Sequence, residues 1–419
     1  MHLNRPSILL SILGVLLACI SGCEGETMDR GVHTDSGGPG ADAVGPNTQR
    51  REFITEAFYP GMAILEETGG DVLVTGPVNG LDLDLSYGPV LGFARFDRDG
   101  GAPTTGHLDI GFSVFVYDIL AHPSGGHVLA GLSNKGTLSS YAWIARVDLG
   151  PSPTIHWQQF FGTGIEHQEQ GFWGLGRSDE GFVAAGFGGE SYGEQRPTLA
   201  AVGTDGTSTG LAYLMTNVPR GIGAFSAVHR CADAANAEPV AVGFMGAYQD
   251  DGSISGAPLV MDYGSEEDMP VTLPDLGYGF IDARVGPSGD LYVIGDIARE
   301  GDPDENDVLV ARLDRATLAP VWSRRLRDAG YEVAIALDLH PSGKVLAAWG
   351  AGRATGDAAL ATVFDFDGNE LDSQVFEQRW VQAAALSSDG MRFYLAGAAR
   401  GPDAAGNAEP GWFLASEIR

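Results

Sequence analysis

Oxygen-bearing side chains at alternating positions make one short segment of this chain a candidate for metal binding. They belong to Asp302, Asp304, Asn306 and Asp307, and calcium is bound by side-chain oxygens spaced in this way. A calcium loop of the EF-hand kind also has a glycine at its sixth position and a glutamate at its twelfth, and here Asp307 and Leu313 stand there. Two interpretations stay open: a loop that binds a ligand or calcium, and a solvated acidic loop.

Side chains suited to nucleophilic or acid–base catalysis are present but scattered. The chain has no His-Glu-x-x-His motif and no paired Cys-x-x-Cys motif. Of its nine histidines, His122 and His340 both precede Pro-Ser-Gly at matching places, which indicates a repeated turn rather than catalysis. The seven tryptophans do not share one place in the repeat, so they indicate core packing rather than a cofactor platform. We expect no catalytic residue, no confident metal site and no cofactor other than the calcium considered above.

Chemistry of a different kind is indicated at the N-terminus. One fixed positive charge, on Arg5, is followed by an apolar run from Ile8 to Ile20 and by small residues before Cys23. This is the layout of a secretion signal. The run is too short to span a membrane, which takes about 20 apolar residues.

The tetrad Ile20-Ser21-Gly22-Cys23 resembles the bacterial lipobox. That resemblance implies a signal peptide over residues 1–22 and a diacylglycerol, with palmitate-type chains, on the Cys23 thiol. A second tetrad, Leu16-Leu17-Ala18-Cys19, has a leucine where the lipobox prefers a small residue. An ordinary signal peptide cut elsewhere is the alternative.

Residues 23–50 read as a tether behind this cysteine. They are rich in Gly, Asp, Pro, Ser and Thr and have few large apolar side chains, so they cannot bury enough surface to fold. Cys231 is then the one remaining cysteine, and no disulfide can form. We expect Cys231 to be a small buried hydrophobic residue rather than a reactive thiol.

The charge balance excludes some partners. Asp and Glu number 55 against 25 Lys and Arg, a formal net charge of −30. Nucleic-acid binding needs clustered positive charge, so we expect no nucleic-acid partner. Docking onto anionic lipid by charge alone is disfavoured for the same reason. Such a charge keeps a secreted domain dispersed, and we expect a monomer.

A repeat organises the rest of the chain. Seven short apolar strands each end in a glycine that follows a turn, at spacings of roughly 50 residues, which is typical of repeat architectures. The glycines are Gly76, Gly131, Gly186, Gly243, Gly295, Gly350 and Gly397. Each unit reads as four strands, so residues 51–419 predict an all-β fold, a seven-bladed β-propeller with four-stranded antiparallel blades. Each glycine is expected either to take a positive φ or to give room to its neighbours.

The last unit indicates how the ring closes. Its first three strands are followed by the end of the sequence, so an outer strand is missing. Residues 51–59 resemble the outer strands of other units, such as 157–161 and 321–326. We therefore expect the N-terminal strand to complete the last blade, which removes an exposed edge.

The recurring Ser/Pro-Gly turn, Val/Leu-Ala-Gly strand and Ala-Arg-Leu-Asp-x-Asp-Gly strand resemble the beta-propeller repeat family found in many predicted bacterial lipoproteins. The resemblance implies a scaffold or binding module. Divergent stretches between second and third strands, among them 296–307 and 351–359, are expected as loops on one face. The acidic ones, with Asp82, Asp84, Asp250 and Asp251, are candidate binding loops, and drift of unconstrained loops explains them equally well.

Two functions follow as expectations. The first is a lipid-anchored, extracytoplasmic binding or scaffold module of the bacterial cell envelope, at the outer membrane, with an envelope protein or a glycan as partner. The second is an envelope enzyme of hydrolase or lyase type, with its active site at the mouth of the propeller channel. Three or more ionisable side chains within reach of one another there would favour the enzyme. A mouth lined by alanine and glycine would favour the binding module.

Overall fold

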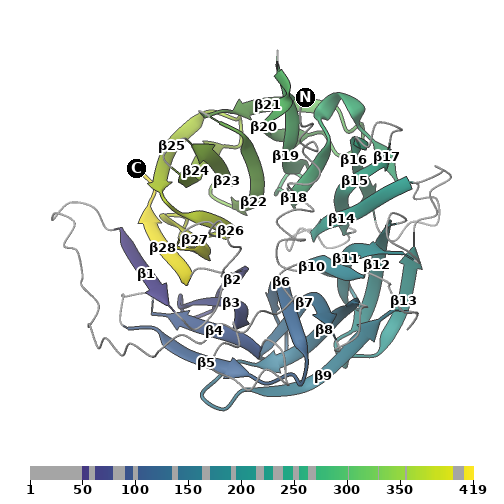
Figure 1. The fold of residues 1–419 in the computed structure, drawn as a ribbon, viewed down its shortest axis with the longest axis vertical. Helices are drawn as coiled ribbons and strands as arrows, with labels where there is room; N and C mark the ends of the chain where they lie inside the picture. Colours follow the sequence, from purple (N-terminus) through teal and green to yellow (C-terminus); the bar gives the residue numbers. More distant parts are fainter. Residues whose placement is uncertain are drawn as a thin grey trace, which may run out of the picture.

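Seven four-stranded antiparallel sheets stand in a ring around a central axis, as Figure 1 shows. The structure is a computed structural model, and it describes residues 50–55, 62–78, 90–97, 102–134, 140–162, 170–189, 195–213, 221–229, 239–248, 254–262, 270–300, 302–328, 330–353, 356–399 and 410–419. The predicted all-β fold and seven-bladed ring are confirmed.

Each blade runs from an inner strand near the axis to an outer strand at the circumference (Figure 1). Blades 1 to 3 consist of β2 (Ala63–Glu66), β3 (Val72–Val78), β4 (Val90–Phe96) and β5 (Thr104–Leu108); β6 (Ser113–Ala121), β7 (His127–Asn134), β8 (Ser140–Asp148) and β9 (Thr154–Phe161); and β10 (Gly171–Arg177), β11 (Gly181–Gly188), β12 (Arg196–Gly203) and β13 (Ser208–Tyr213).

Blades 4 to 6 follow the same order. They consist of β14 (Gly221–His229), β15 (Val240–Tyr248), β16 (Ile254–Asp262) and β17 (Val271–Thr272); β18 (Gly279–Val285), β19 (Leu291–Arg299), β20 (Asp302–Leu313) and β21 (Pro320–Leu326); and β22 (Glu332–His340), β23 (Lys344–Arg353), β24 (Gly356–Asp365) and β25 (Glu370–Glu377). Blade 7 contains β26 (Trp380–Leu386), β27 (Arg392–Ala398), β28 (Gly411–Glu417) and β1 (Arg51–Thr55).

The core lies between the blades. Second strands such as β11 are buried along their whole length because each face of the sheet is covered by a neighbouring blade. The one helical element among the described residues is a 3₁₀ turn, Pro274–Leu276. No helix within the described part of the chain has the length and apolar character that crossing a membrane requires.

β1 lies beside β28 and forms the outer edge of blade 7. Phe53 pairs with Phe413 in an antiparallel register that runs from Arg51 to Thr55. The Phe53 ring also lies 5.4 Å from that of Phe96 in blade 1. The Glu52 carboxylate accepts hydrogen bonds from Trp412 Nε1 at 2.9 Å and Arg379 Nε at 2.6 Å. The start of the described domain is thus held to its end.

The repeated glycine provides room for a backbone carbonyl. A Cβ at Gly131 would lie 1.9 Å from the carbonyl oxygen of Phe115 on the adjacent inner strand. Similar distances of 1.9 to 2.2 Å are found at Gly186, Gly243, Gly295 and Gly397. None of these five glycines has a positive φ. Of the two explanations offered above, close approach is therefore the one that applies at these positions.

Several expected loops are shorter than the sequence suggested. The segment 296–307 is not a loop, because β19 extends to Arg299 and β20 begins at Asp302. Residues 351–359 likewise belong mostly to β23 and β24. Asp82, Asp84, Asp250, Asp251, Cys19, Cys23 and Cys231 lie outside the described residues, so the predictions made for them stay predictions.

Candidate functional site

The inner strands of six blades share a β-bulge that inserts one extra residue. In blade 2, for example, Val116 pairs with Gly131 and Asp118 with Ala130, so the register of the two strands shifts at Tyr117. The bulged residues are Tyr117, Trp173, Ser226, Ile281, Ile335 and Gln382. All six are half-buried, whereas the residues just before them are fully buried. Bulges re-aim side chains in this way.

These half-buried residues lie on the inner strands, the strands of each blade nearest the axis of the ring (Figure 1). We call the six bulged residues the axial ring. In it, blades 2 and 3 contribute two neighbouring aromatic side chains, Tyr117 and Trp173. The Trp173 ring lies 4.8 Å from that of Phe187. Its buried Nε1 makes no hydrogen bond within the described part of the chain.

Charged side chains lie just beyond the axial ring, toward the short turns between first and second strands. Arg284 Nη1 lies 2.5 Å from Asp282 Oδ1, and Arg284 Nε lies 3.5 Å from Asp338 Oδ1 in the next blade. Asp118, from blade 2, is close enough for the Arg284 guanidinium to oppose the rise in pKa that burial of this carboxyl causes. We call Asp118, Asp282, Arg284 and Asp338 the axial charge cluster.

Backbone N–H groups hold these carboxylates in place. Asp282 accepts hydrogen bonds from its own strand, at Ala283 N (2.7 Å), and from the next blade, at Leu337 N (2.9 Å). Asp118 and Asp338 bond in the same way, each to its own strand and to the following blade. Each carboxylate therefore joins two blades.

Burial is the largest influence on the pKa of two carboxylates of the cluster, Asp118 and Asp282. It raises the pKa of Asp118 to about 6, against the opposing effects of Arg284 and of two backbone N–H groups. It raises the pKa of Asp282 as well. The pKa of the Arg284 guanidinium is raised because the attraction of three aspartates outweighs its own burial. Nearby His229 is buried, and its pKa falls to about 3, so it is a neutral acceptor for Val285 N at 2.9 Å.

In chemical terms, the axial charge cluster pairs a fixed cation with carboxylates, one of which, Asp118, has its pKa raised to about 6. Its ionisable groups are within reach of one another, which is the arrangement that the enzyme alternative requires. No group of three or more His, Cys, Asp or Glu side chains suited to a metal ion occurs among the described residues.

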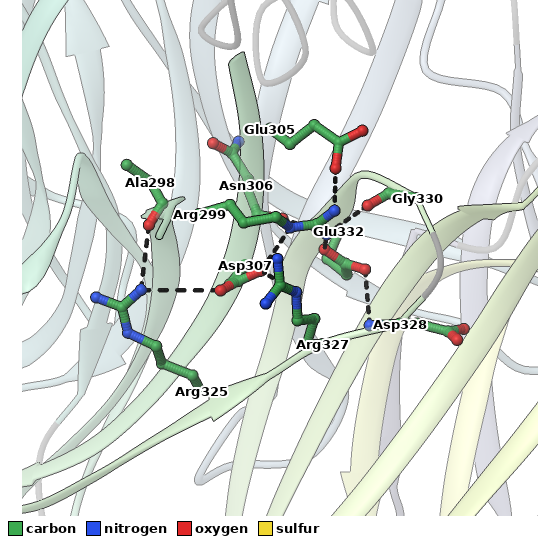
Figure 2. A network of polar contacts seen from close by, with 10 residues as sticks. All are labelled: Ala298, Arg299, Glu305, Asn306, Asp307, Arg325, Arg327, Asp328, Gly330 and Glu332. Atoms are coloured by element: carbon green, nitrogen blue, oxygen red, sulfur yellow. Dashed lines mark hydrogen bonds and ion pairs between the residues drawn. The ribbon is translucent and has the colours of Figure 1, made fainter. Parts of the chain in front are cut away.

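A second charged group of residues lies at the opposite end of blades 5 and 6, and Figure 2 shows it. Arg299 bonds to Asp307 at 2.9 Å and contacts the carboxylates of Glu305 and Glu332. Arg325 and Arg327 lie 3.8 Å and 3.6 Å from Asp307.

This arrangement bears on the candidate calcium segment. Asp302, Asp304, Asn306 and Asp307 belong to strand β20, so the expectation of a loop was wrong. Asp307 is buried against arginine, and Asn306 is buried as well. Calcium binding at this segment stays a prediction.

The histidines and outer tryptophans hold turns and blades together. His122 and His340 each accept the N–H of the serine two residues on, at 3.1 Å. Trp157 and Trp322 each bond through Nε1 to a carbonyl of the next blade, at Thr204 and Phe366.

The segment Gly206-Thr207-Ser208-Thr209-Gly210 has the spacing of a Gly-x-Ser-x-Gly nucleophile elbow. The elbow places its serine on a sharp turn between a strand and a helix. Here the segment joins strands β12 and β13, and Ser208 is the first residue of β13. The motif is therefore part of an ordinary β-hairpin.

No protein-family model and no curated protein matches the sequence. Solved structures with a similar fold include the Dos1 propeller, at 9% identity over 87% of this chain and 94% of that one, with a TM-score of 0.48. A protein of unknown function from Dyadobacter fermentans has 12% identity, coverage of 88% and 99%, and a TM-score of 0.46. Puromycin hydrolase has 17% identity, coverage of 82% and 51%, and a TM-score of 0.49. These likenesses carry no argument about function.

Proposed function

We propose that the protein is a lipid-anchored binding module of the bacterial cell envelope and that it engages its ligand along the propeller axis. The observation that supports this is the axial ring, in which the inner strands of six blades each carry a half-buried residue at a bulge. Rigid scaffolds that converge on a few aromatic and polar groups are typical of binding sites. The lipid anchor is proposed from Cys23 and the apolar run before it.

Two measurements on the full chain in bacterial cells test this proposal. Labelling with an alkyne analogue of palmitate should mark the wild type and should be lost in Cys23→Ala, with the chain moving from the membrane to the soluble fraction. A photoreactive p-benzoylphenylalanine in place of Tyr117 or Trp173 should give a reproducible adduct. The matched control carries it at exposed His107, on the outer strand β5. Label that persists in Cys23→Ala, or adducts at position 107 but not at the axis, would contradict the proposal.

The axial charge cluster supports a second candidate, an envelope hydrolase or lyase. Asp118 has the raised pKa that a general acid needs near neutral pH, and Arg284 could stabilise a developing anion. In this case the wild type should turn over one of a panel of chromogenic esters and glycosides. Asp118→Asn should abolish that turnover, and the control Asp148→Asn, at the end of strand β8 and half-exposed, should retain it. Absence of turnover across the panel would reject the enzyme.

A further inference from the structure

Large apolar side chains are exposed on one part of the ring. Those on the described surface are Ile54, Val271, Val321, Tyr331, Leu371, Val375 and Met391. All of them belong to blades 4 to 7 or to the connection between blades 5 and 6. Within the described residues of blades 1 to 3, no large apolar side chain reaches this exposure.

Four of these side chains lie on the outer strands of three consecutive blades. Val321 on β21 is 55% exposed, Leu371 and Val375 on β25 are 44% and 40% exposed, and Ile54 on β1 is 58% exposed. Leu371 and Val375 lie on the same strand, and the two residues adjacent to them on the inside of this stretch, Asp372 and Gln374, are less exposed. Figure 1 shows β21, β25 and β1 in succession along one arc of the circumference. We call these four residues the rim patch.

Arginines flank the rim patch in a chain that has few basic residues. Arg324 and Arg325 are exposed on β21, and Arg51 is exposed on β1. The middle strand, β25, carries exposed Glu370 and Glu377. The rim is therefore mixed in charge, although the chain as a whole has a net charge of −30. A surface of this kind can approach anionic headgroups without strong repulsion, and its attraction comes from the apolar side chains.

The path of the chain brings the proposed lipid to this same arc. Arg50 directly precedes β1, and residues 24–49 join it to Cys23. A lipid on Cys23 therefore keeps blade 7 closer to the membrane than the opposite side of the ring. Tethering of this kind raises the effective concentration of a weak second contact.

We propose that the rim patch rests against the phospholipid headgroups of the membrane that anchors Cys23, so that the ring stands on its edge. This inference depends on the proposed lipidation of Cys23. A second copy of the chain is the competing occupant. Four aliphatic side chains on a convex arc offer far less area than the ~1,200 Å² that specific protein interfaces bury, whereas an anchored protein needs only a weak membrane contact. In this orientation both faces of the ring stay open to a ligand along the axis.

Depth-dependent quenching tests the orientation. The lipidated full chain, with Cys231→Ser, is reconstituted in vesicles of phosphatidylethanolamine and phosphatidylglycerol that contain doxyl-labelled lipid. An NBD dye is attached at Val375→Cys, and the matched control carries it at Thr105→Cys on β5 of blade 1. Doxyl lipid should quench NBD several-fold more at position 375 than at position 105. Equal quenching at the two positions would overturn the proposal.

Two further arms separate the possible failures. If the wild type does not sediment with vesicles, the lipid anchor itself fails, and the proposed function fails with it. If it sediments but NBD is quenched equally at both positions, only the rim contact is wrong. Leu371→Ser/Val375→Ser should retain the circular dichroism of the wild type and reduce hydrogen-exchange protection of β25 on vesicles. A dimer in detergent that this double variant converts to a monomer would assign the rim patch to a second copy and overturn the proposal.

Discussion

The Asp118 carboxylate accepts a hydrogen bond from the backbone N–H of Leu175 at 2.7 Å, although the two residues belong to different blades. Asp282 makes the equivalent bond to Leu337, at 2.9 Å. In both pairs the aspartate directly follows the bulged residue of its inner strand. The N–H that the aspartate binds belongs to the next blade, to the residue two positions after that blade's own bulged residue. In these two blades the residue that follows the bulge is thus the one whose side chain joins two blades.

Removing one of these carboxylates should weaken the ring measurably. Asp282→Ala leaves the N–H groups of Ala283 and Leu337 without their acceptor and removes the closest partner of Arg284. A buried polar group without a partner costs about 1–3 kcal/mol, so we expect a loss of about 3 kcal/mol in the free energy of unfolding. Urea denaturation near neutral pH measures it.

The control for Asp282→Ala is Glu370→Ala at an exposed position on β25, which should stay within about 0.5 kcal/mol of the wild type. Asp282→Asn should fall between the two, because the amide retains one acceptor oxygen. An Asp282→Ala variant as stable as the Glu370 control would show that the carboxylate does not hold the blades together.

The repeated glycines should differ sharply in their tolerance of alanine. At Gly131 a Cβ would lie 1.9 Å from the Phe115 carbonyl oxygen, and backbone would have to move. At Gly350 the nearest atom would be 3.9 Å away, on the Trp380 ring. The position of the bulge in blade 6 explains the difference. In the other five bulged blades the bulge directly follows the residue that pairs with the repeated glycine. In blade 6 it lies one residue further along the inner strand, between Ala334 and Ala336. We expect Gly131→Ala to lose about 3 kcal/mol or fail to fold, and Gly350→Ala to change stability by less than about 1 kcal/mol.

Thermal unfolding of the two variants side by side measures this difference. The substitutions are chemically identical and lie at equivalent repeat positions, so each is the control of the other. Equal losses at Gly131 and Gly350 would contradict the explanation by close approach. They would point instead to a demand shared by all seven glycines.

The ring was predictable from the sequence because its determinants are local and repeated. Turns such as Pro123-Ser124-Gly125 and apolar second strands such as β11 recur in each unit, and covering both faces of such strands leaves few architectures. The bulges were not predictable in the same way. Tyr117 lies within a mostly apolar run, and nothing in the sequence marks it as the position of a bulge.

The charged groups escaped prediction for a related reason. Asp302 and its neighbours have the composition of a turn, which predicts a loop. Their pairing with β19 is irregular between Ala298 and Arg299, which accommodates this composition inside a hairpin. The partners of Asp307 and Glu332 come from other strands. Arg299 is 33 positions away from Glu332, so only the assembled blades bring the two together.

Arg299 should be the most sensitive residue of the group in Figure 2. Arg299→Met leaves Glu332, whose side chain is fully buried, and Asp307 without their closest cation. Breaking a buried ion pair from one side typically costs about 3–5 kcal/mol, and we expect a loss of that size in urea denaturation. Arg325→Met, whose side chain is half exposed, should cost less than about 1 kcal/mol.

A second substitution tests the cause of the Arg299 effect. In Arg299→Met/Glu332→Gln the Glu332 carboxylate, which the loss of Arg299 leaves unpaired, is replaced by a neutral amide. The double variant should therefore recover part of the stability that Arg299→Met loses. If the double variant is less stable than Arg299→Met alone, the loss does not come from an unpaired carboxylate. Packing of the arginine side chain would then be the main contribution.

Asp296 should make the protein less stable as the pH rises from acidic to neutral. The side chain is buried on β19 and accepts a hydrogen bond from Ala334 N at 2.8 Å, and burial raises its pKa to about 7. An unfolded aspartate has a pKa of about 3.9, so between these values the folded state holds a proton that the unfolded state has released. The free energy of unfolding therefore falls across this window, and the penalty is complete above about pH 7.

Asp296→Asn isolates that contribution. The amide is neutral at every pH and retains an oxygen that can accept from Ala334, so the variant should lose less stability than the wild type between about pH 4 and pH 7. Asp118, with its pKa of about 6, titrates in the same range in both proteins and cancels in the difference. Glu67, whose pKa is lowered to about 2, acts below this window. The measurement is the urea midpoint against pH for both proteins. Parallel curves would mean that Asp296 is ionised in the folded state throughout, which its burial on β19 argues against.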